Sequence, residues 1–309
     1  MKATKIISAC AVLVALASCS NDHVISQPGA EDTPIRIQAN VGAVTTKAAY
    51  NLLESTFSSG DAINVYIGEN TSNTSTSSGG AYTSTVYSYT GSTFTTTNTQ
   101  YFPANGNGID VWGVYPSTVN ESSTSQDFSI KNDQTSDADY KASDLMFATE
   151  LINKKKNDQI RLTFAHQLSK IIVKLAQETG VNANLTDAVI KLTNVSTKVP
   201  LTKVDNTGIT LGTASTDPQY ISELIIGKYE ATNGTAAIVI PQSTTGMSFK
   251  VELVGGGTYT ASMPASTTDF VANKAYTFNL TLKANGINVS ADIAPWTSGT
   301  GGNGDATLN

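Results

Sequence analysis

The sequence predicts an all-β protein made of two tandem β-sandwich domains with few short helices. Apolar and polar residues alternate with a period of two in many short runs, which is typical of half-buried β-strands. Gly, Asn, Ser and Pro separate these runs at short intervals, as in sandwiches built from many short strands. The length of 309 residues is enough for two domains that each bury a core.

The first predicted strand covers residues 35–44, where Ile35, Ile37 and Val41 alternate with polar neighbours. Because a half-buried strand points successive side chains to opposite faces, these three residues are expected to face a core. Further strand-like runs occupy 63–67, 85–89, 109–115, 159–164, 170–175, 188–195, 236–240, 247–254, 276–282 and 287–293.

The segments between these runs read mainly as loops. The stretch 71–99 is rich in Ser and Thr and has too few apolar residues for a core of its own, so we expect surface loops around the run at 85–89. Helical patterning is confined to 48–56 and part of 179–187. The predicted helices are therefore few and short.

The first 18 residues have the pattern of a secretory signal. Two lysines precede an apolar run that is too short to span a membrane. The Leu-Ala-Ser-Cys sequence at 16–19 resembles the bacterial lipobox, so we expect Cys19 to be lipidated and to begin the mature protein; the alternative is an ordinary signal peptide with a chance Cys. Two or three acyl chains would anchor the protein to a membrane without spanning it.

Composition suggests how the mature chain is divided. Residues 19–34 are polar and read as a tether, and 297–309 as a flexible, Gly-rich tail. The run Lys154-Lys155-Lys156 predicts a linker, which gives an N-terminal domain at 35–157 and a C-terminal domain at 158–296. An exposed hairpin tip is the competing interpretation of the lysine run.

Charge and residue counts argue against nucleic-acid binding and catalysis. The formal net charge is −6 and the basic residues form no extended patch, so attraction to phosphate backbones is not expected. His23 lies in the tether, which leaves His166 beside a predicted strand, where we expect a structural, hydrogen-bonded role. No nucleophile elbow and no phosphate-binding loop occurs. We therefore predict no enzyme, no cofactor and no metal site.

Two other features have both a structural and a functional interpretation. Asp133, Asp137 and Asp139 form an acidic cluster, but the glycine and distal glutamate of a calcium loop are missing, so solvated loop acids are expected. Trp112 and Trp296 lie within or just after predicted strands, which favours core packing or a domain contact over an exposed sugar platform.

The order of motifs resembles the fimbrillin family, the type V pilins of Bacteroides-type bacteria, and in particular its minor-fimbrium-like lipoproteins. The matching pieces span nearly the whole chain and keep their order. They are the lipobox at 16–19 and the segments 46–48, 57–66, 111–116, 143–148, 162–171, 275–282 and 293–296.

This resemblance implies two transthyretin-like β-sandwich domains and export to the outer membrane as a surface-exposed lipoprotein of a fimbrium. In polymerising members a protease removes the leader with the first strand, and the vacated groove accepts a strand from the next subunit. The family cleavage sequence Thr-Arg-Ala matches Thr46-Lys47-Ala48, so cleavage is expected between Lys47 and Ala48. A protease strict for Arg would not cut there, and the alternative Arg36 lies inside the first strand.

The donor of the replacement strand stays open at this point. Ile287, Val289 and Ile293 alternate with polar residues in a segment that either donates to a neighbour or closes its own domain. The tail at 297–309 lacks alternating apolar residues and is a poor donor.

The predicted function is that of a structural and adhesive fimbrial subunit. Its expected partners are other fimbrial subunits, whether copies of itself or minor ones, the outer membrane through its lipid, and host or bacterial surface ligands. A stalk, tip or anchor position is left open. The alternative is a glycan-binding surface lipoprotein, for which Tyr82, Tyr87 and Tyr89 are the candidate platform, although strand alternation explains Tyr87 and Tyr89 equally well.

Overall fold

The computed structural model describes residues 33–42, 56–77, 81–119, 125–204, 208–284 and 286–296. Strands dominate these residues, which confirms the all-β prediction and is compatible with tandem sandwiches. Among the described residues, no helix is both long and apolar enough to cross a bilayer.

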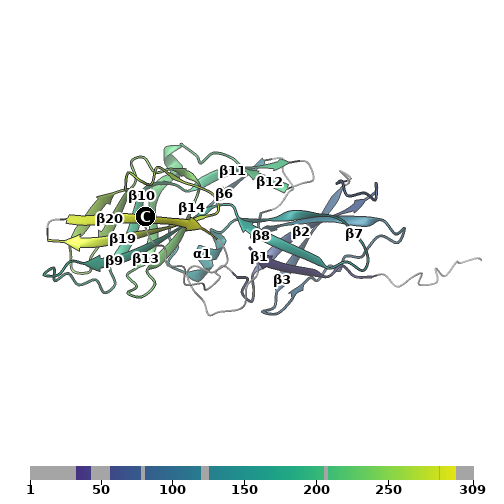
Figure 1. Ribbon diagram of the computed structural model, residues 1–309, viewed down its shortest axis with the longest axis horizontal. Helices are drawn as coiled ribbons and strands as arrows, with labels where there is room; N and C mark the ends of the chain where they lie inside the picture. Colours follow the sequence, from purple (N-terminus) through teal and green to yellow (C-terminus); the bar gives the residue numbers. More distant parts are fainter. Residues whose placement is uncertain are drawn as a thin grey trace, which may run out of the picture. The chain divides into compact units, whose positions relative to one another are not determined.

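A seven-stranded sheet contains most of the N-terminal strands (Figure 1). In spatial order its strands are β1 (Ile37–Val41), β8 (Ile160–His166), β7 (Met146–Lys154), β5 (Gly108–Tyr115), β2 (Ala62–Asn70), β3 (Tyr82–Tyr89) and β4 (Phe94–Thr95). One face of the sheet buries an apolar cluster that includes Ile37, Val65 and Phe164, called here the N-terminal core. Because β1 and β4 are the last strands in this order, each keeps one edge outside the sheet's ladders.

Two four-stranded sheets form a sandwich in the C-terminal part. The first contains β13 (Ile221–Lys228), β10 (Val189–Ser196), β16 (Ser248–Glu252) and β17 (Thr258–Ser262), and the second β14 (Thr235–Val239), β9 (Ser169–Gln177), β19 (Lys274–Lys283) and β20 (Gly286–Pro295). The rings of Phe249 and Phe278, one from each sheet, lie 4.8 Å apart between centroids in the shared core. A small sheet of β15 (Gln242–Ser243) and β18 (Asp269–Phe270) accompanies them.

A three-stranded sheet contributes to a third apolar cluster. It contains β12 (Gly208–Leu211), β11 (Lys198–Val204) and β6 (Ser125–Ser129). Val199 of β11 lies in the same buried cluster as Tyr66 and Trp112, whose rings stack 4.0 Å apart between centroids. Since the N-terminal core occupies the other face, every residue of β5 is buried.

The boundary expected near residue 157 requires a correction. Residues 155–159 form the turn between β7 and β8, two neighbours in the same sheet, and the chain continues from β8 to β9 at Gln167 and Leu168. Strand β6 from the first half also pairs with β11 from the second. The lysine run is the hairpin tip of the competing interpretation: its composition reflects solvent exposure at the tip, where Lys156 is exposed.

Neither of the two predicted helical segments is observed as a helix within the described residues. Residues 48–55 lie outside the described ranges, and 179–187 contain turns instead of a helix, because Gly180 and Asp187 have φ of +91° and +61°. Within the described ranges an α-helix forms at α1 (Asp137–Ala142), which was not predicted. Ser136 caps it by accepting a hydrogen bond from the Asp139 backbone N–H at 3.1 Å. A one-turn 3-10 helix, η1, spans Pro218–Tyr220.

Candidate functional site

Strand β1, the predicted exchangeable strand, lies at the edge of the seven-stranded sheet and beside β8 (Figure 1). It pairs with β8 in parallel, from Ile37 opposite Ile160 to Val41 opposite Phe164. Just before β1, the Ile35 backbone N–H donates to the Gln100 carbonyl at 2.8 Å. The segment 33–42 is thus held by β8 along its C-terminal part and by the chain after β4 at its start.

The burial of this segment alternates as the sequence predicts. Ile35, Ile37 and Val41 are only 4%, 4% and 5% exposed, and all three belong to the N-terminal core. Gln38 is exposed, and its side-chain oxygen accepts a hydrogen bond from Arg161 of β8 at 3.2 Å. The first strand therefore inserts apolar side chains into a groove while its polar face stays in solvent.

The candidate donor segment forms β20. It pairs with β19 along its whole length, from Lys274 opposite Pro295 to Lys283 opposite Gly286. Ile287 and Val289 are half-buried against the C-terminal core, whereas Ile293 is 52% exposed. In this structure the segment completes its own sheet as an edge strand and leaves its last isoleucine in solvent. The other predicted sites, Cys19, Lys47 and Ala48, lie outside the described residues.

His166, the last residue of β8, has structural contacts of the kind expected. Its Nδ1 lies 2.9 Å from Asp144 Oδ1, and its ring stacks on Trp296 with centroids 3.6 Å apart and planes 5° from parallel. His166 and Trp296 are 3% and 2% exposed. The core-packing prediction for Trp296 and Trp112 is confirmed, since both indoles are buried in the same cluster.

The tyrosine platform of the glycan-binding alternative does not form. Tyr87 is 2% exposed and belongs to the N-terminal core, and Tyr89 packs against Phe94 with centroids 4.9 Å apart. Tyr82 is half-buried and donates its hydroxyl to Glu150 at 2.6 Å. Strand alternation places Tyr82 on the opposite face of β3 from Tyr87 and Tyr89, which pack on the N-terminal core, so the three rings provide no shared stacking surface.

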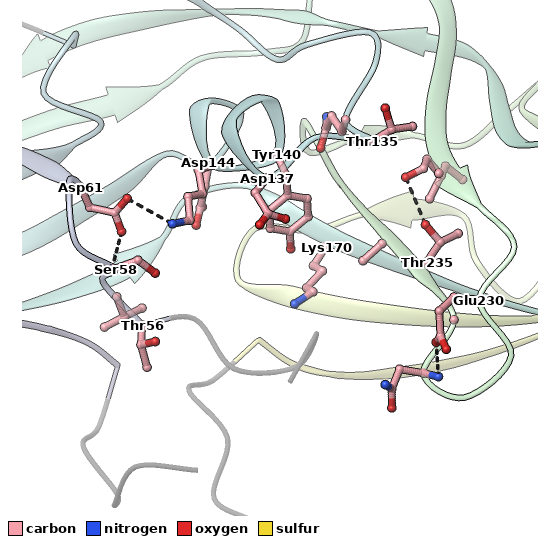
Figure 2. Close-up of a pocket in the computed structure, with 18 of the residues that line it drawn as sticks. Thr56, Ser58, Asp61, Thr135, Asp137, Tyr140, Asp144, Lys170, Glu230 and Thr235 are labelled. Atoms are coloured by element: carbon pink, nitrogen blue, oxygen red, sulfur yellow. Dashed lines mark hydrogen bonds and ion pairs between the residues drawn. The ribbon is translucent and has the colours of Figure 1, made fainter. Parts of the chain in front are cut away.

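A pocket of about 520 Å³ adjoins the end of β1 (Figure 2). Val41, the helix α1, Lys170 of β9 and the segment 226–236 contribute to its wall. Several of its carboxylates already have partners. Asp61 accepts hydrogen bonds from the Ser58 backbone N–H at 2.6 Å and from Lys141 at 3.5 Å.

Lys170 is the unusual residue of this pocket. It is 2% exposed, and its Nζ lies 5.8 Å from the ring centroids of both Tyr140 and Trp296. Within the described residues, no hydrogen bond or ion pair reaches this amine. Burial lowers the pKa of Lys170 to about 8, an effect that the charge of Asp144 partly opposes.

The two rings compensate the buried charge only in part. A cation–π contact contributes about 0.5–2 kcal/mol, whereas removing an ammonium from water costs several kcal/mol. The sequence analysis did not predict this site, because Lys170 is the first residue of a predicted strand and a lysine at such a position is expected to be exposed to solvent. The first five residues of β9 are all buried, so both faces of the strand are covered at this point.

The comparisons with known proteins agree with the fold. Residues 46–296 match the sequence model of the fimbrillin-like family. The chain belongs to the fimbrillin-like family. This match covers β2 to β20 and begins after β1, so the predicted exchangeable strand lies outside the matched region.

Three individual relatives of this fimbrillin each share less than 30% sequence identity with it. A Bacteroides uniformis protein named as fimbrium subunit Fim1C is 29% identical over 98% of both chains. A cell adhesion protein from Bacteroides ovatus has a crystal structure similar to this fold, with a TM-score of 0.67, 20% identity, and coverage of 87% of this chain and 99% of that one. The crystal structure of a cell adhesion protein from Bacteroides uniformis is also similar, with a TM-score of 0.64 and 21% identity. That match covers 85% of this chain and 98% of the other.

Proposed function

We propose that this fimbrillin is a structural subunit of a fimbrium, exported as a lipoprotein to the outer membrane and assembled by strand complementation. The observation that carries the proposal is the position of β1, an edge strand with one ladder neighbour. Ile37 and Val41 of β1, together with Ile35 just before it, fill the groove. Removing an edge strand opens a groove without separating two other strands. The name of the relative Fim1C supports the same role.

The energetics of β1 favour its replacement by a strand from a neighbouring subunit over removal that leaves the groove empty. Each buried Ile or Val contributes about 1.5–3 kcal/mol, and ordering the backbone costs about 1–2 kcal/mol per residue. Because these terms are of similar size, a neighbour's strand with the same alternation replaces β1 at little net change in free energy. An empty groove would expose both the apolar core and the edge of β8, which is an aggregation hazard.

Cleavage between Lys47 and Ala48 would detach β1 from the rest of the chain. Arg36 is a poorer site, because the backbone around it is held by Gln100 and by β8. We propose that a protease accepting lysine matures this subunit.

Trypsin treatment of the purified precursor tests the assembly step. The first cut is expected at Lys47, and the trimmed product is expected to form laddered oligomers on size-exclusion chromatography and denaturing gels run without boiling. The control variant Lys47→Gln should stay uncut at this position and monomeric. A trimmed wild-type protein that remains monomeric at all concentrations would refute polymerisation through the β1 groove.

The donor strand can be tested separately through Ile293. If the 287–293 segment donates, Ile293 moves from solvent into a neighbour's groove, so Ile293→Asp should block oligomers while leaving the thermal stability of the precursor unchanged. The adjacent exposed Asp292→Asn is the matched control. Undiminished oligomers of Ile293→Asp would show that β20 only closes its own sheet.

The lipid anchor is tested through Cys19. Replacing Cys19 with Ala removes the acceptor thiol, so the protein should move from the membrane fraction to the soluble fraction of fractionated cells. Metabolic labelling with a palmitate analogue provides the second readout. Persistence of Cys19→Ala in the membrane fraction would contradict lipidation at this residue.

A further inference from the structure

The pocket beside β1 contains a buried amine that the proposed assembly does not use. Lys170 is 2% exposed, yet its amine has no acceptor among the described residues. Figure 2 shows its side chain extending into the pocket beside Tyr140. A buried cation without a paired anion is costly to keep, which suggests that a ligand supplies the missing acceptor.

The neighbouring carboxylates cannot neutralise Lys170 fully. Asp144 interacts with it only through space and already binds His166 at 2.9 Å. Asp61 is engaged by Ser58 and Lys141, and Glu230 accepts a hydrogen bond from the Thr232 backbone N–H at 3.0 Å. The amine therefore has no acceptor within the described part of the chain, and a carboxylate brought by a ligand would give it a charge-assisted hydrogen bond.

We propose that this pocket binds a small sugar acid, with the ligand carboxylate on Lys170 and its hydroxyl groups on the polar wall. The wall presents the hydroxyl of Ser58 and the amide of Asn233, and the ring of Phe57 offers an apolar face. The hydroxyls of Thr135 and Thr235 donate to Asp133 and Ile226, so their oxygens can still accept hydrogen bonds from a ligand. A volume of about 520 Å³ suits one or two sugar rings.

A single carboxylate fits better than a phosphate group. Asp61, Asp137, Asp144 and Glu230 all line the pocket, so a ligand with two negative charges would meet strong repulsion. One negative charge is matched by Lys170, while the acidic side chains can accept hydrogen bonds from ligand hydroxyls.

Isothermal titration of the full chain in detergent tests the proposal. The probes are sodium glucuronate, N-acetylneuraminate, the neutral isostere glucuronamide, inorganic phosphate and a short acidic peptide. Saturable binding of at least one sugar acid is expected, together with no measurable binding of glucuronamide. Lys170→Met should weaken sugar-acid binding by about tenfold or more, because it removes the charged donor.

Lys174→Met is the matched control. Lys174 lies on β9 like Lys170, but its side chain is exposed and it is not among the residues that line the pocket. This variant should bind the sugar acid like the wild type, and Lys170→Arg should keep part of the affinity because it keeps the charge.

A second measurement uses only the wild-type protein. The bound sugar acid should protect the Lys170 amine from acetylation by acetic anhydride, as read by peptide mass spectrometry, while the exposed Lys174 reacts as before. Failure of both sugar acids to bind, equal binding of glucuronamide, or unchanged binding by Lys170→Met would overturn the proposal. Binding of the acidic peptide alone would also overturn it and assign the pocket to a partner protein.

Discussion

The imidazole of His166 lies flat against the indole of Trp296, with ring centroids 3.6 Å apart and planes 5° from parallel. His166 ends β8, the strand that holds β1, whereas Trp296 follows β20, the candidate donor. The backbone N–H of Trp296 also donates to the Asn273 carbonyl at 2.9 Å. The end of β20 is thereby fixed to the sheet that contains β1.

Truncation of Trp296 should strongly destabilise the protein. Trp296→Ala removes the stacking surface of His166 and leaves a cavity in the shared cluster, at an expected cost of about 3–5 kcal/mol in the free energy of unfolding. Urea denaturation measures the change. Ile293→Ala, on the exposed part of β20, should stay within about 0.5 kcal/mol of wild type, and an equally large effect there would argue against a specific role for the stack.

A charge placed on the buried face of β1 should weaken the packing of this strand against the N-terminal core. Ile37→Asp loses about 1.5–3 kcal/mol of apolar burial and adds a carboxylate that must be desolvated. We expect a lower unfolding free energy and faster proteolysis around residue 37. Gln38→Asp, on the exposed face, is the control. Equal proteolysis rates for the two variants would mean that β1 is not held by its apolar face.

The stability of the protein should rise between about pH 8 and pH 10. The pKa of Lys170 is about 8 when folded and 10.5 ordinarily, so in this window the unfolded chain binds a proton that the folded chain has lost. Stability then rises with pH, by about 2 kcal/mol over the window. Burial raises the pKa values of Tyr82, Tyr87 and Tyr115, whose contributions are lost only at higher pH.

Lys170→Met isolates this contribution from the other ionisable groups. The titratable groups that line the same pocket are Asp61, Tyr115, Asp137, Tyr140, Lys141, Asp144, Lys228 and Glu230. Chemical denaturation at several pH values should show a flatter profile for the variant. Parallel profiles for wild type and Lys170→Met would show that the amine keeps an ordinary pKa.

Gln134 should be essential for the edge of β14. Its side-chain amide donates to the Ile238 carbonyl at 2.9 Å and accepts from the Ile238 backbone N–H at 2.8 Å. Gln134→Ala leaves two buried backbone groups without partners, at about 1–3 kcal/mol each. Hydrogen exchange at Ile238 should accelerate accordingly. The half-buried Gln167 is the control: Gln167→Ala loses only a local bond to the Ala165 carbonyl and should leave exchange at Ile238 unchanged.

Local alternation predicted the strands whose two faces differ. In β8, and in β19 from Tyr276 onward, the buried residues recur at every second position, and Ile37 and Val41 of β1 keep the same spacing, so local sequence was enough to predict these strands. The run at 221–228, which forms β13, was not predicted, and neither was β6, because their partners and not their own periodicity decide their state. The helix α1 had a readable signal in Ser136 and Asp139, the two ends of a cap.

The pocket could not be predicted in the same way. Lys170, Asp61 and Glu230 are far apart in the chain, and nothing in their local sequence indicates a shared cavity. The domain boundary was misplaced for a related reason: the lysine run showed solvent exposure, which a linker and a hairpin tip have in common.

The sequence by itself determined the all-β class, the alternating strands and the resemblance to fimbrillins, and it predicts a signal with a lipobox, because each of these depends on neighbouring residues. Only the tertiary structure decided that β1 lies at a sheet edge, that β6 pairs with β11, and that Lys170 is buried without an acceptor among the described residues. These features depend on contacts between segments that are distant in the sequence. The free energy of such contacts cannot be predicted from a local sequence pattern.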